Sequence, residues 1–332
     1  MKILYAIQGT GNGHLSRSMD IVPLLQKMGK VDVLVSGTQG DLKLPFPVKY
    51  QLHGFGFVFG KAGGVDLWKS FLKSHFRKFI KEIQDLPIEN YDVVINDFEP
   101  VSAWACYMKN KPCIGLSHQA AVLHEQAPLP PDSDAIGRLI LKNYAPVTSN
   151  YGFHFKAIGE NIYTPVIRQQ VREQVITNKG HYTVYLPAYD DKRLIKRLSE
   201  FKDVQWDVFS KHNKKVIKTK NITIQPINNE AFIKSMAESA GILSGGGFET
   251  PAEALFMQKK LLVIPMKNQY EQQLNAAMLK DMGVPVIKSL KPKHSEVIQD
   301  WLDNGKVVKV NYPDTTQQIL DKVFSNLKQI PD

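Results

Sequence analysis

The sequence has few cysteines and no long apolar run. Its 332 residues contain two cysteines, Cys106 and Cys113, and neither has a Cys or His partner at metal-ligand spacing. This excludes a disulfide framework and a zinc site of the usual kind, so we expect two buried free thiols and no bound metal. No apolar stretch approaches the roughly 20 residues that cross a bilayer, and the first residues lack the charged start of a signal peptide. These absences predict a cytoplasmic protein.

Tracts rich in glycine, proline or serine are also missing, so we expect the whole chain to fold. The length of 332 residues predicts about two domains. Hydrophobic residues make up 43% and charged residues 22% of the chain, as in globular proteins. Lys and Arg outnumber Asp and Glu by 42 to 32, and the formal net charge of +10 favours an anionic partner. Nucleic acid is not the expected partner, because no zinc-finger spacing, RNP-like aromatic motif or basic leucine-zipper pattern is present.

Short β-type apolar runs alternate with helical patterns in two series. The strand patterns are 2–8, 31–37, 91–97, 111–117, 181–189, 206–210, 221–227, 240–246 and 261–266. The main helical patterns are 16–28, 101–110, 191–201, 229–239, 251–258 and 271–283. This alternation predicts an α/β fold of two Rossmann-like domains with parallel sheets, facing across a cleft that holds a ligand at the carboxyl ends of the strands. We expect an N-terminal domain at 1–162, a linker at 163–178, a C-terminal domain at 179–312 and, at 313–332, a helix that packs back on the N-terminal domain.

The first glycine-rich loop, GTGNGHLSRS at 9–18, follows the first strand and opens a helix. Its glycines permit close backbone approach to a ligand, and the helix start offers free N–H groups to an anion. The dinucleotide fingerprint G-x-G-x-x-G has His14 in place of its third glycine, and no acidic residue ends the second strand, so a dinucleotide site is not expected. The helix dipole keeps His14 neutral, which suits a general base; a histidine that only shapes the loop is the equal alternative.

The second glycine-rich loop is SGGGFETPAEAL at 244–255, which again follows a strand and opens a helix. Three consecutive glycines allow backbone amides to approach a phosphate. Thr250, Pro251 and Glu253 also fit a capping box with Thr250 as N-cap, and that pattern favours a structural role for Glu253. One helix later, Glu271, Gln272 and Asn275 occur in EQQLNA, with Asn275 one turn beyond Glu271 on the same face. We expect these side chains to point into the same cleft.

As an ordered set, these motifs resemble the GT-B glycosyltransferases, in particular the branch related to the enzyme that adds N-acetylglucosamine to the lipid-linked peptidoglycan precursor. A group of bacterial and archaeal relatives opens with the same G-x-G-x-G-H-x-x-R-S loop, and the similarity covers nearly the whole chain, including SHQ at 117–119 and NITIQPINN at 221–229. The resemblance implies that the C-terminal domain binds a nucleotide-sugar donor, a UDP-sugar. The implied donor residues are Ile227 at the base, Gly245, Gly246, Gly247 and Thr250 at the diphosphate, Glu253 at the ribose, and Glu271, Gln272 and Asn275 at the sugar. Many relatives have a histidine where this chain has Gly245, so phosphate contact relies on backbone amides or on a basic residue elsewhere.

The same resemblance assigns the acceptor to the N-terminal domain. His14 and Asp97 are the implied catalytic residues, and the acceptor-side residues are Gly11, Asn12, Gly13, Glu99, His118 and Gln119. A hydrogen-bonded strand end is the alternative interpretation of the His118–Gln119 pair. The implied reaction uses no cofactor or metal and inverts the anomeric carbon, with a base taking the acceptor proton while amides stabilise the departing nucleotide diphosphate. The open alternatives are a nucleotide-sugar 2-epimerase of the same fold and a non-catalytic subunit that binds a sugar nucleotide or lipid carrier.

A basic amphipathic pattern covers residues 66–84, with apolar residues at three- and four-residue spacing and Lys and Arg on the other faces. An ordinary helix packed on the N-terminal sheet explains this pattern. The alternative is contact with an anionic membrane at its inner face, which would give the enzyme access to a lipid-linked acceptor. The acceptor itself, a glycan or a lipid-linked molecule, is not identified by these residues.

Overall fold

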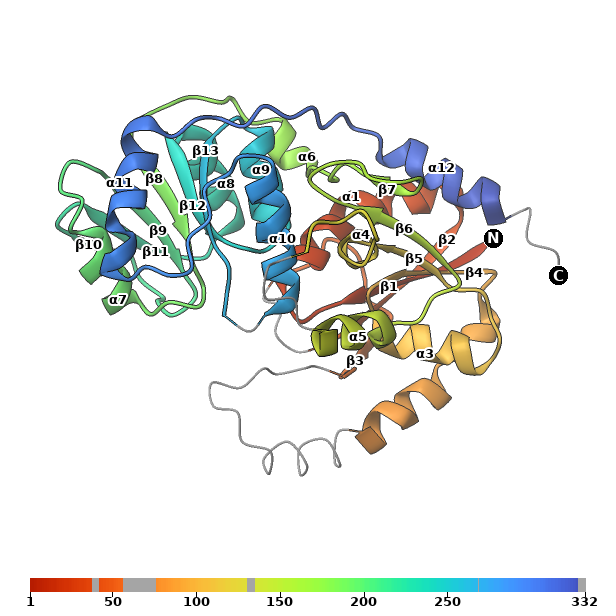
Figure 1. The fold of residues 1–332 in the computed structure, drawn as a ribbon. Helices are drawn as coiled ribbons and strands as arrows, with labels where there is room; N and C mark the ends of the chain where they lie inside the picture. Colours follow the sequence, from red (N-terminus) through yellow and green to blue (C-terminus); the bar gives the residue numbers. More distant parts are fainter. Residues whose placement is uncertain (38–41, 56–75, 130–134, 268, 328–332) are drawn as a thin grey trace. The chain divides into compact units, whose positions relative to one another are not determined.

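The computed structural model describes residues 1–37, 42–55, 76–129, 135–267 and 269–327. It divides the chain into two compact units, each built on one sheet (Figure 1). The first unit holds the described residues of Met1–Ala127, Asp134–Arg168 and Pro313–Asp332, and the second holds those of Pro128–Ser133 and Gln169–Tyr312. The predicted α/β class is confirmed for both.

The first unit has a seven-stranded parallel sheet with the order β3-β2-β1-β4-β5-β6-β7. The strands are β1 (Lys2–Gln8), β2 (Lys30–Ser36), β3 (Tyr50–Leu52), β4 (Val93–Asp97), β5 (Ile114–Ser117), β6 (Ser149–Phe153) and β7 (Ile162–Tyr163). The order runs outward in two directions from β1 and β4, and Ile7 of β1 lies opposite Asp97 of β4. The carboxyl ends of these two strands therefore form a topological switch point, where ligands bind in doubly wound sheets.

The helices of the first unit come from both ends of the chain. They are α1 (Asn12–Met28), η1 (Ile88–Asn90), α3 (Pro100–Met108), α4 (His118–Val122), α5 (Ala135–Tyr144) and α12 (Thr316–Leu327), together with a helical segment at 76–85. Helix α1 starts at Asn12, inside the glycine-rich loop and earlier than the pattern at 16–28 predicts. The apolar period marks only the buried face from Leu15 onward, whereas Gly11, extended at φ −159°, is the N-cap.

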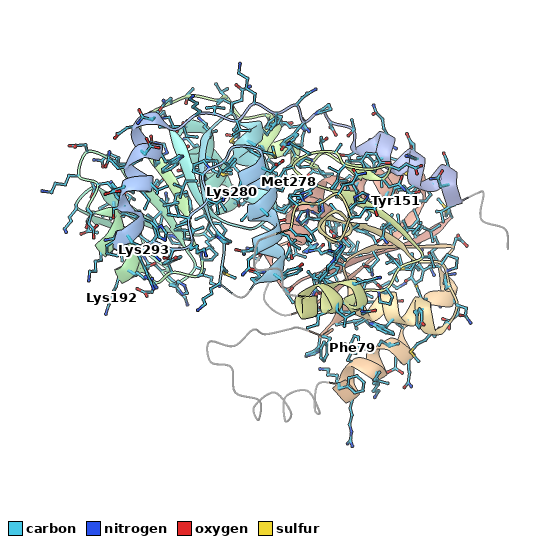
Figure 2. All side chains as sticks on the ribbon, viewed as in Figure 1. Phe79, Tyr151, Lys192, Met278, Lys280 and Lys293 are labelled. Atoms are coloured by element: carbon cyan, nitrogen blue, oxygen red, sulfur yellow. The ribbon has the colours of Figure 1, made fainter. Side chains whose placement is uncertain are left out.

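The core of the first unit lies between its sheet and its helices. Cys106 and Cys113 are both buried free thiols, and the neighbouring Cys106 thiol together with burial raises the pKa of Cys113 well above its usual value. Residues 66–75 of the predicted amphipathic helix lie outside the described residues. The described segment 76–85 buries Phe79, which is labelled in Figure 2, and Ile83 in this core, while Phe76 is exposed. None of the described helices has the length and hydropathy of a membrane span.

The second unit repeats the order of the first five strands of the first unit and has one added edge strand. Its sheet has the order β10-β11-β9-β8-β12-β13, parallel throughout except that β10 is antiparallel to β11. The strands are β8 (Tyr182–Tyr185), β9 (Trp206–Ser210), β10 (Ile217–Thr219), β11 (Ile222–Pro226), β12 (Gly241–Gly245) and β13 (Lys260–Ile264). The helices are α6 (Gln169–Arg172), α7 (Asp191–Leu198), α8 (Asn229–Glu238), α9 (Glu249–Phe256), α10 (Tyr270–Asp281), η2 (Pro292–His294) and α11 (Ser295–Asn304). Here the switch point lies at the carboxyl ends of β8 and β12.

Candidate functional site

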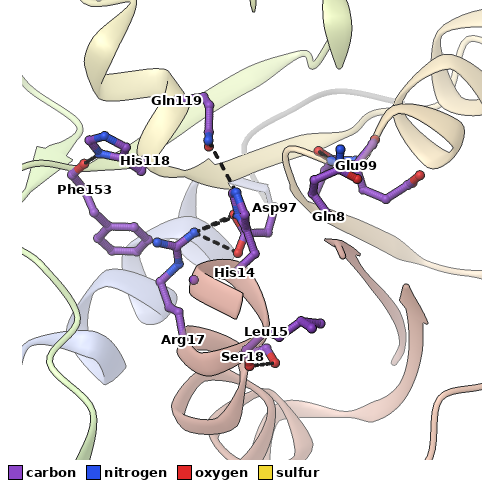
Figure 3. A network of polar contacts seen from close by, with 12 residues as sticks. Gln8, His14, Leu15, Arg17, Ser18, Asp97, Glu99, His118, Gln119 and Phe153 are labelled. Atoms are coloured by element: carbon purple, nitrogen blue, oxygen red, sulfur yellow. Dashed lines mark hydrogen bonds and ion pairs between the residues drawn. The ribbon is translucent and has the colours of Figure 1, made fainter. Parts of the chain in front are cut away.

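At the switch point of the first unit, a histidine and an arginine share one buried carboxylate (Figure 3). His14 lies in the first turn of α1 and Asp97 ends β4, and His14 Nδ1 is 2.8 Å from Asp97 Oδ1. Arg17, one turn beyond His14, places Nη2 at 2.7 Å and 2.9 Å from the two Asp97 oxygens. The structure therefore brings His14 and Asp97 together and adds Arg17 to the same cluster.

The geometry assigns a direction to the His14–Asp97 hydrogen bond. A carboxylate only accepts hydrogen bonds, so the Nδ1–H of His14 donates to Asp97, and in the neutral form of this ring Nε2 carries the lone pair. The His14 side chain is 16% exposed, whereas Asp97 is fully buried. Gln119 Nε2 lies 3.4 Å from His14 Nε2. The ring is thus oriented by a buried acid, with its second nitrogen next to Gln119.

The charge of Asp97 is maintained by its neighbours. Burial would by itself raise the pKa of this carboxyl, but the Arg17 guanidinium and His14 outweigh that effect and hold the pKa below its usual value. The sequence analysis missed Arg17. Its signal was present, because a residue three positions after His14 lies on the same helical face, and the arginine is only 1% exposed.

Two of the predicted acceptor-side residues, Glu99 and His118, are buried. Glu99 is fully buried at the N-cap of α3, where its carboxylate oxygens accept from Val101 N at 2.7 Å and Ser102 N at 2.6 Å. Burial raises the pKa of Glu99, and the hydrogen bonds from Ser102 and Val101 offset only part of that shift. His118 is 1% exposed and its Nδ1–H donates to Phe153 O at 2.7 Å. Both side chains are therefore held by hydrogen bonds to the backbone inside the first unit.

The glycines of the opening loop differ in the space around them, since a Cβ on Gly9 would lie 2.8 Å from Val35 Cγ1. A Cβ on Gly11 would meet no atom within 4 Å, and Gly11, Asn12 and Gly13 are all half-buried. Because Asn12 and Gly13 belong to the first turn of α1, their amide N–H groups have no earlier helical carbonyl to bond. The first turn of α1 therefore begins within the loop, beside His14.

In the second unit, the second glycine-rich loop is bonded to the start of α10. Gln272 Oε1 accepts from Gly246 N at 3.1 Å and from Met266 N at 2.9 Å. Asn275, which is fully buried, donates from Nδ2 to Gly246 O at 3.0 Å. A Cβ on Gly246 would lie 2.8 Å from the Gln272 carbonyl oxygen, whereas one on Gly247 would meet nothing within 4 Å. Gly246 is thus required by packing, and Gly247 has open space.

The capping box expected at Thr250 is not formed. Helix α9 begins at Glu249, with Phe248 as an N-cap that makes no side-chain cap hydrogen bond, so Thr250 is already the second helical residue. The αR conformation of the buried Phe248 extends the helix toward the glycines. The other predicted donor residues lie on or next to three elements. Glu253 is on α9 and is 2% exposed, and Ile227 follows β11 and is 37% exposed. Glu271 is half-buried in the first turn of α10.

The residues described at the two switch points are not a set of metal ligands. Among the residues that the structure describes, no three His, Cys, Asp or Glu side chains come close enough together to hold one ion. The two switch points present different functional groups. The first edge has a histidine oriented by a buried acid, and the second has a glycine-rich turn at a helix start that lacks a side-chain cap.

Comparison with known proteins identifies the family and the fold. A family model described as Glycosyl transferase family 1 matches residues 1–305. Among solved structures, UGT2 of Phytolacca americana, complexed with UDP-2-fluoro-glucose and pterostilbene, aligns with a TM-score of 0.60 at 13% identity, covering 99% of this chain and 100% of that one. MurG of Acinetobacter baumannii aligns with a TM-score of 0.53 at 14% identity (98% and 100% covered), and the glycosyltransferase SnogD of Streptomyces nogalater with 0.55 at 12% (100% and 96%). No curated protein matches by sequence. These similarities establish the GT-B fold of two Rossmann-like domains.

Proposed function

The chain belongs to glycosyl transferase family 1, and on this premise we propose that it transfers a sugar from a UDP-sugar to an acceptor hydroxyl, with inversion and without a metal. The observation that carries the proposal is the His14–Asp97 hydrogen bond of 2.8 Å at the switch point of the first sheet. A histidine oriented in this way by a buried carboxylate is the arrangement that a general base requires.

In the proposed reaction, His14 Nε2 takes the proton of the acceptor hydroxyl. The acceptor oxygen forms a bond to the anomeric carbon while the bond from that carbon to the phosphate oxygen breaks, and the nucleoside diphosphate leaves with the electron pair. The imidazolium that forms is stabilised by Asp97, which stays ionised because of Arg17. Attack opposite the leaving group inverts the anomeric carbon.

The proposed donor site is the glycine-rich loop of the second unit. Backbone amides at Gly245 and Gly247 and the start of α9 would hold the diphosphate, since the loop is open at these glycines. Ile227 would meet the base, with Thr250 at the phosphates and Glu253 at the ribose. Glu271 and Gln272 would bind the sugar. Asn275 would position the loop, because its side chain donates a hydrogen bond to the Gly246 carbonyl. The UDP-2-fluoro-glucose named for the Phytolacca enzyme supports a uridine nucleotide.

Turnover of a panel of UDP-sugars, measured as UDP release, tests the base. We expect His14→Gln to lower the rate by about 10²- to 10⁴-fold, the usual contribution of a general base, while UDP affinity stays within about twofold of wild type. His53→Gln is the matched control, since His53 is an exposed histidine of the same unit that pairs with Glu82. Equal rates for the His14 variant and wild type would refute this role for His14.

Calorimetric titration with UDP tests the donor site separately. Wild type should bind UDP, and Glu253→Ala should weaken that binding at least tenfold if the carboxylate meets the ribose. Failure of UDP and of other nucleoside diphosphates to bind would overturn the donor proposal whatever the outcome for His14.

We also propose that the protein works at the inner face of a membrane, on a glycan or lipid-linked acceptor. This proposal rests on the helical segment at 76–85, where Phe76 is exposed beside the exposed Arg77, Lys78 and Lys81. Co-sedimentation with phosphatidylcholine vesicles, with and without 30 mol% phosphatidylglycerol, checks this. Equal recovery in the two cases would speak against membrane contact.

A further inference from the structure

A cavity of about 610 Å³ lies within the first unit, over the ends of β4 and β5 and beside α5. Its wall includes Ser117, the last residue of β5, and Gly115 in the same strand. A Cβ on Gly115 would lie 2.9 Å from Asn150 Oδ1, so the glycine leaves room for the Asn150 side chain in the wall. The volume is within the range of ordinary small-molecule sites and exceeds what a single small ion fills.

This cavity adjoins the proposed base. Gln119 lines it, and the same side chain places Nε2 3.4 Å from His14 Nε2. Asn96 and Phe98, the two neighbours of Asp97 in the chain, also line it. A molecule bound there would therefore lie next to the side chain that contacts the reactive nitrogen of His14.

The charges on the cavity wall favour an anion. Arg138 and Lys142 are four residues apart on α5, so they share one helical face, and both line the cavity. Arg138 is half-buried, and its Nη2 donates to Leu123 O at 3.3 Å, which fixes the guanidinium at the wall. Among the described lining residues Glu160 is the one carboxylate; it is exposed, as Lys142 is, whereas Arg138 is half-buried, so positive charge exceeds negative charge on this wall.

We propose that this cavity binds a phosphate group carried by the acceptor, with Arg138 and Lys142 as its cationic contacts. A guanidinium matches two phosphate oxygens, and an ammonium adds a second positive charge, so the pair balances a phosphate monoester dianion. The remaining volume accommodates the organic part, whose hydroxyl would extend past Gln119 toward His14. Identifying the ligand as the acceptor rests on the proposed function; the phosphate site itself does not.

Calorimetric titration with phenyl phosphate, and with benzyl alcohol as its neutral counterpart, tests the site. Wild type should bind phenyl phosphate and not benzyl alcohol, and R138Q/K142Q should lose at least tenfold in affinity. The control K192Q/K196Q removes the same two charges at the same spacing from α7, where both side chains are exposed and line no part of this cavity (Lys192 is labelled in Figure 2), and should bind as wild type does. If R138Q/K142Q fails to fold, Lys142→Gln alone serves, because that side chain is exposed, with a loss of at least threefold expected.

Several outcomes would overturn the proposal: no binding of phenyl phosphate by wild type, equal affinity for benzyl alcohol, or equal affinity of wild type and R138Q/K142Q. The last outcome would also arise if phenyl phosphate bound only at the glycine-rich loop of the second unit. Vesicles of phosphatidylcholine with 20 mol% phosphatidate, tested with the same variants, distinguish a lipid phosphate from a soluble one, and charge-dependent binding of either supports the site. Titration of wild type and of R138Q/K142Q with UDP separates the two proposals. Absence of UDP binding by wild type overturns only the donor assignment, and the double variant should bind UDP as wild type does.

Discussion

At the scale of single residues, Asp97 connects the Arg17 guanidinium and the His14 ring of the first site. It is fully buried, and its two oxygens are contacted by the Arg17 guanidinium, one of them also by the His14 ring. A buried carboxylate without partners would be protonated at neutral pH, so its charge depends on Arg17. Arg17 in turn is 1% exposed and depends on Asp97 for a counter-charge. Removing either partner leaves an uncompensated charge in the core.

Asp97→Asn should therefore destabilise the protein by about 3–5 kcal/mol at pH 7. Because the folded-state pKa of Asp97 is lowered, this stabilisation is fully present above the ordinary pKa of about 3.9 and is lost as pH falls through the lower folded value. The stability difference between wild type and variant should shrink as pH is lowered from about 5 toward 2. Urea unfolding across this range measures the difference.

Asp92→Asn serves as the comparison, because Asp92 is an exposed carboxylate that accepts from Lys2 N. We expect less than about 1 kcal/mol of change there at any pH in the series. A difference for Asp97→Asn that stays constant down to pH 2 would mean that Asp97 is not a carboxylate of lowered pKa.

At the scale of elements, the turn from β12 to α9 is held by α10 through the side chains of Gln272 and Asn275. The sequence pattern predicted the strand, the glycines and the helix. It placed the helix start wrongly, because the Thr-Pro-x-Glu pattern is a local signal, whereas the buried Phe248 takes the helical conformation that precedes it. A similar local limit applies to β6 and β7, whose short sequences carry little apolar alternation and which form by pairing at the sheet edge.

The two neighbouring glycines of this turn should respond differently to alanine. Gly246→Ala places a Cβ 2.8 Å from the Gln272 carbonyl oxygen, so we expect about 1–3 kcal/mol of destabilisation from overpacking. Gly247→Ala points into open space and should change stability by less than about 0.5 kcal/mol while still weakening UDP binding. Urea unfolding and calorimetry measure the two effects. The reverse order of stability would contradict the packing described for Gly246.

At the scale of the whole molecule, each sheet has its own apolar core, and the chain returns to the first unit at its end. Helix α12 buries Ile319, Leu320, Val323 and Phe324, and Asn326 Nδ2 donates to Tyr151 OH of β6 at 2.7 Å. In the second unit, α11 buries Ile298, Trp301 and Leu302 in the core of that sheet. The last helix in sequence therefore stabilises the first sheet.

Leu320→Ala and Leu302→Ala form a matched pair that tests this division. Each removes a buried leucine, 1% and 7% exposed respectively, and should cost about 2–5 kcal/mol. Hydrogen exchange followed by mass spectrometry should show faster exchange in β1 and β4 for Leu320→Ala, and in β8 and β12 for Leu302→Ala. Equal acceleration in both sheets for either variant would show that the two cores unfold as one.

The sequence alone determined the alternation of strands and helices, the two glycine-rich loops and the family resemblance, because periodicity, glycine placement and ordered motifs are local properties of the chain. Only the tertiary structure decided which side chains meet. Asp97 lies 80 residues from Arg17, and their contact exists because β1 and β4 are neighbours in the sheet. The same packing buries Glu99 and His118 below the surface and opens a cavity lined by Gln119 and Arg138. Such contacts follow from strand order and burial, which no single segment encodes.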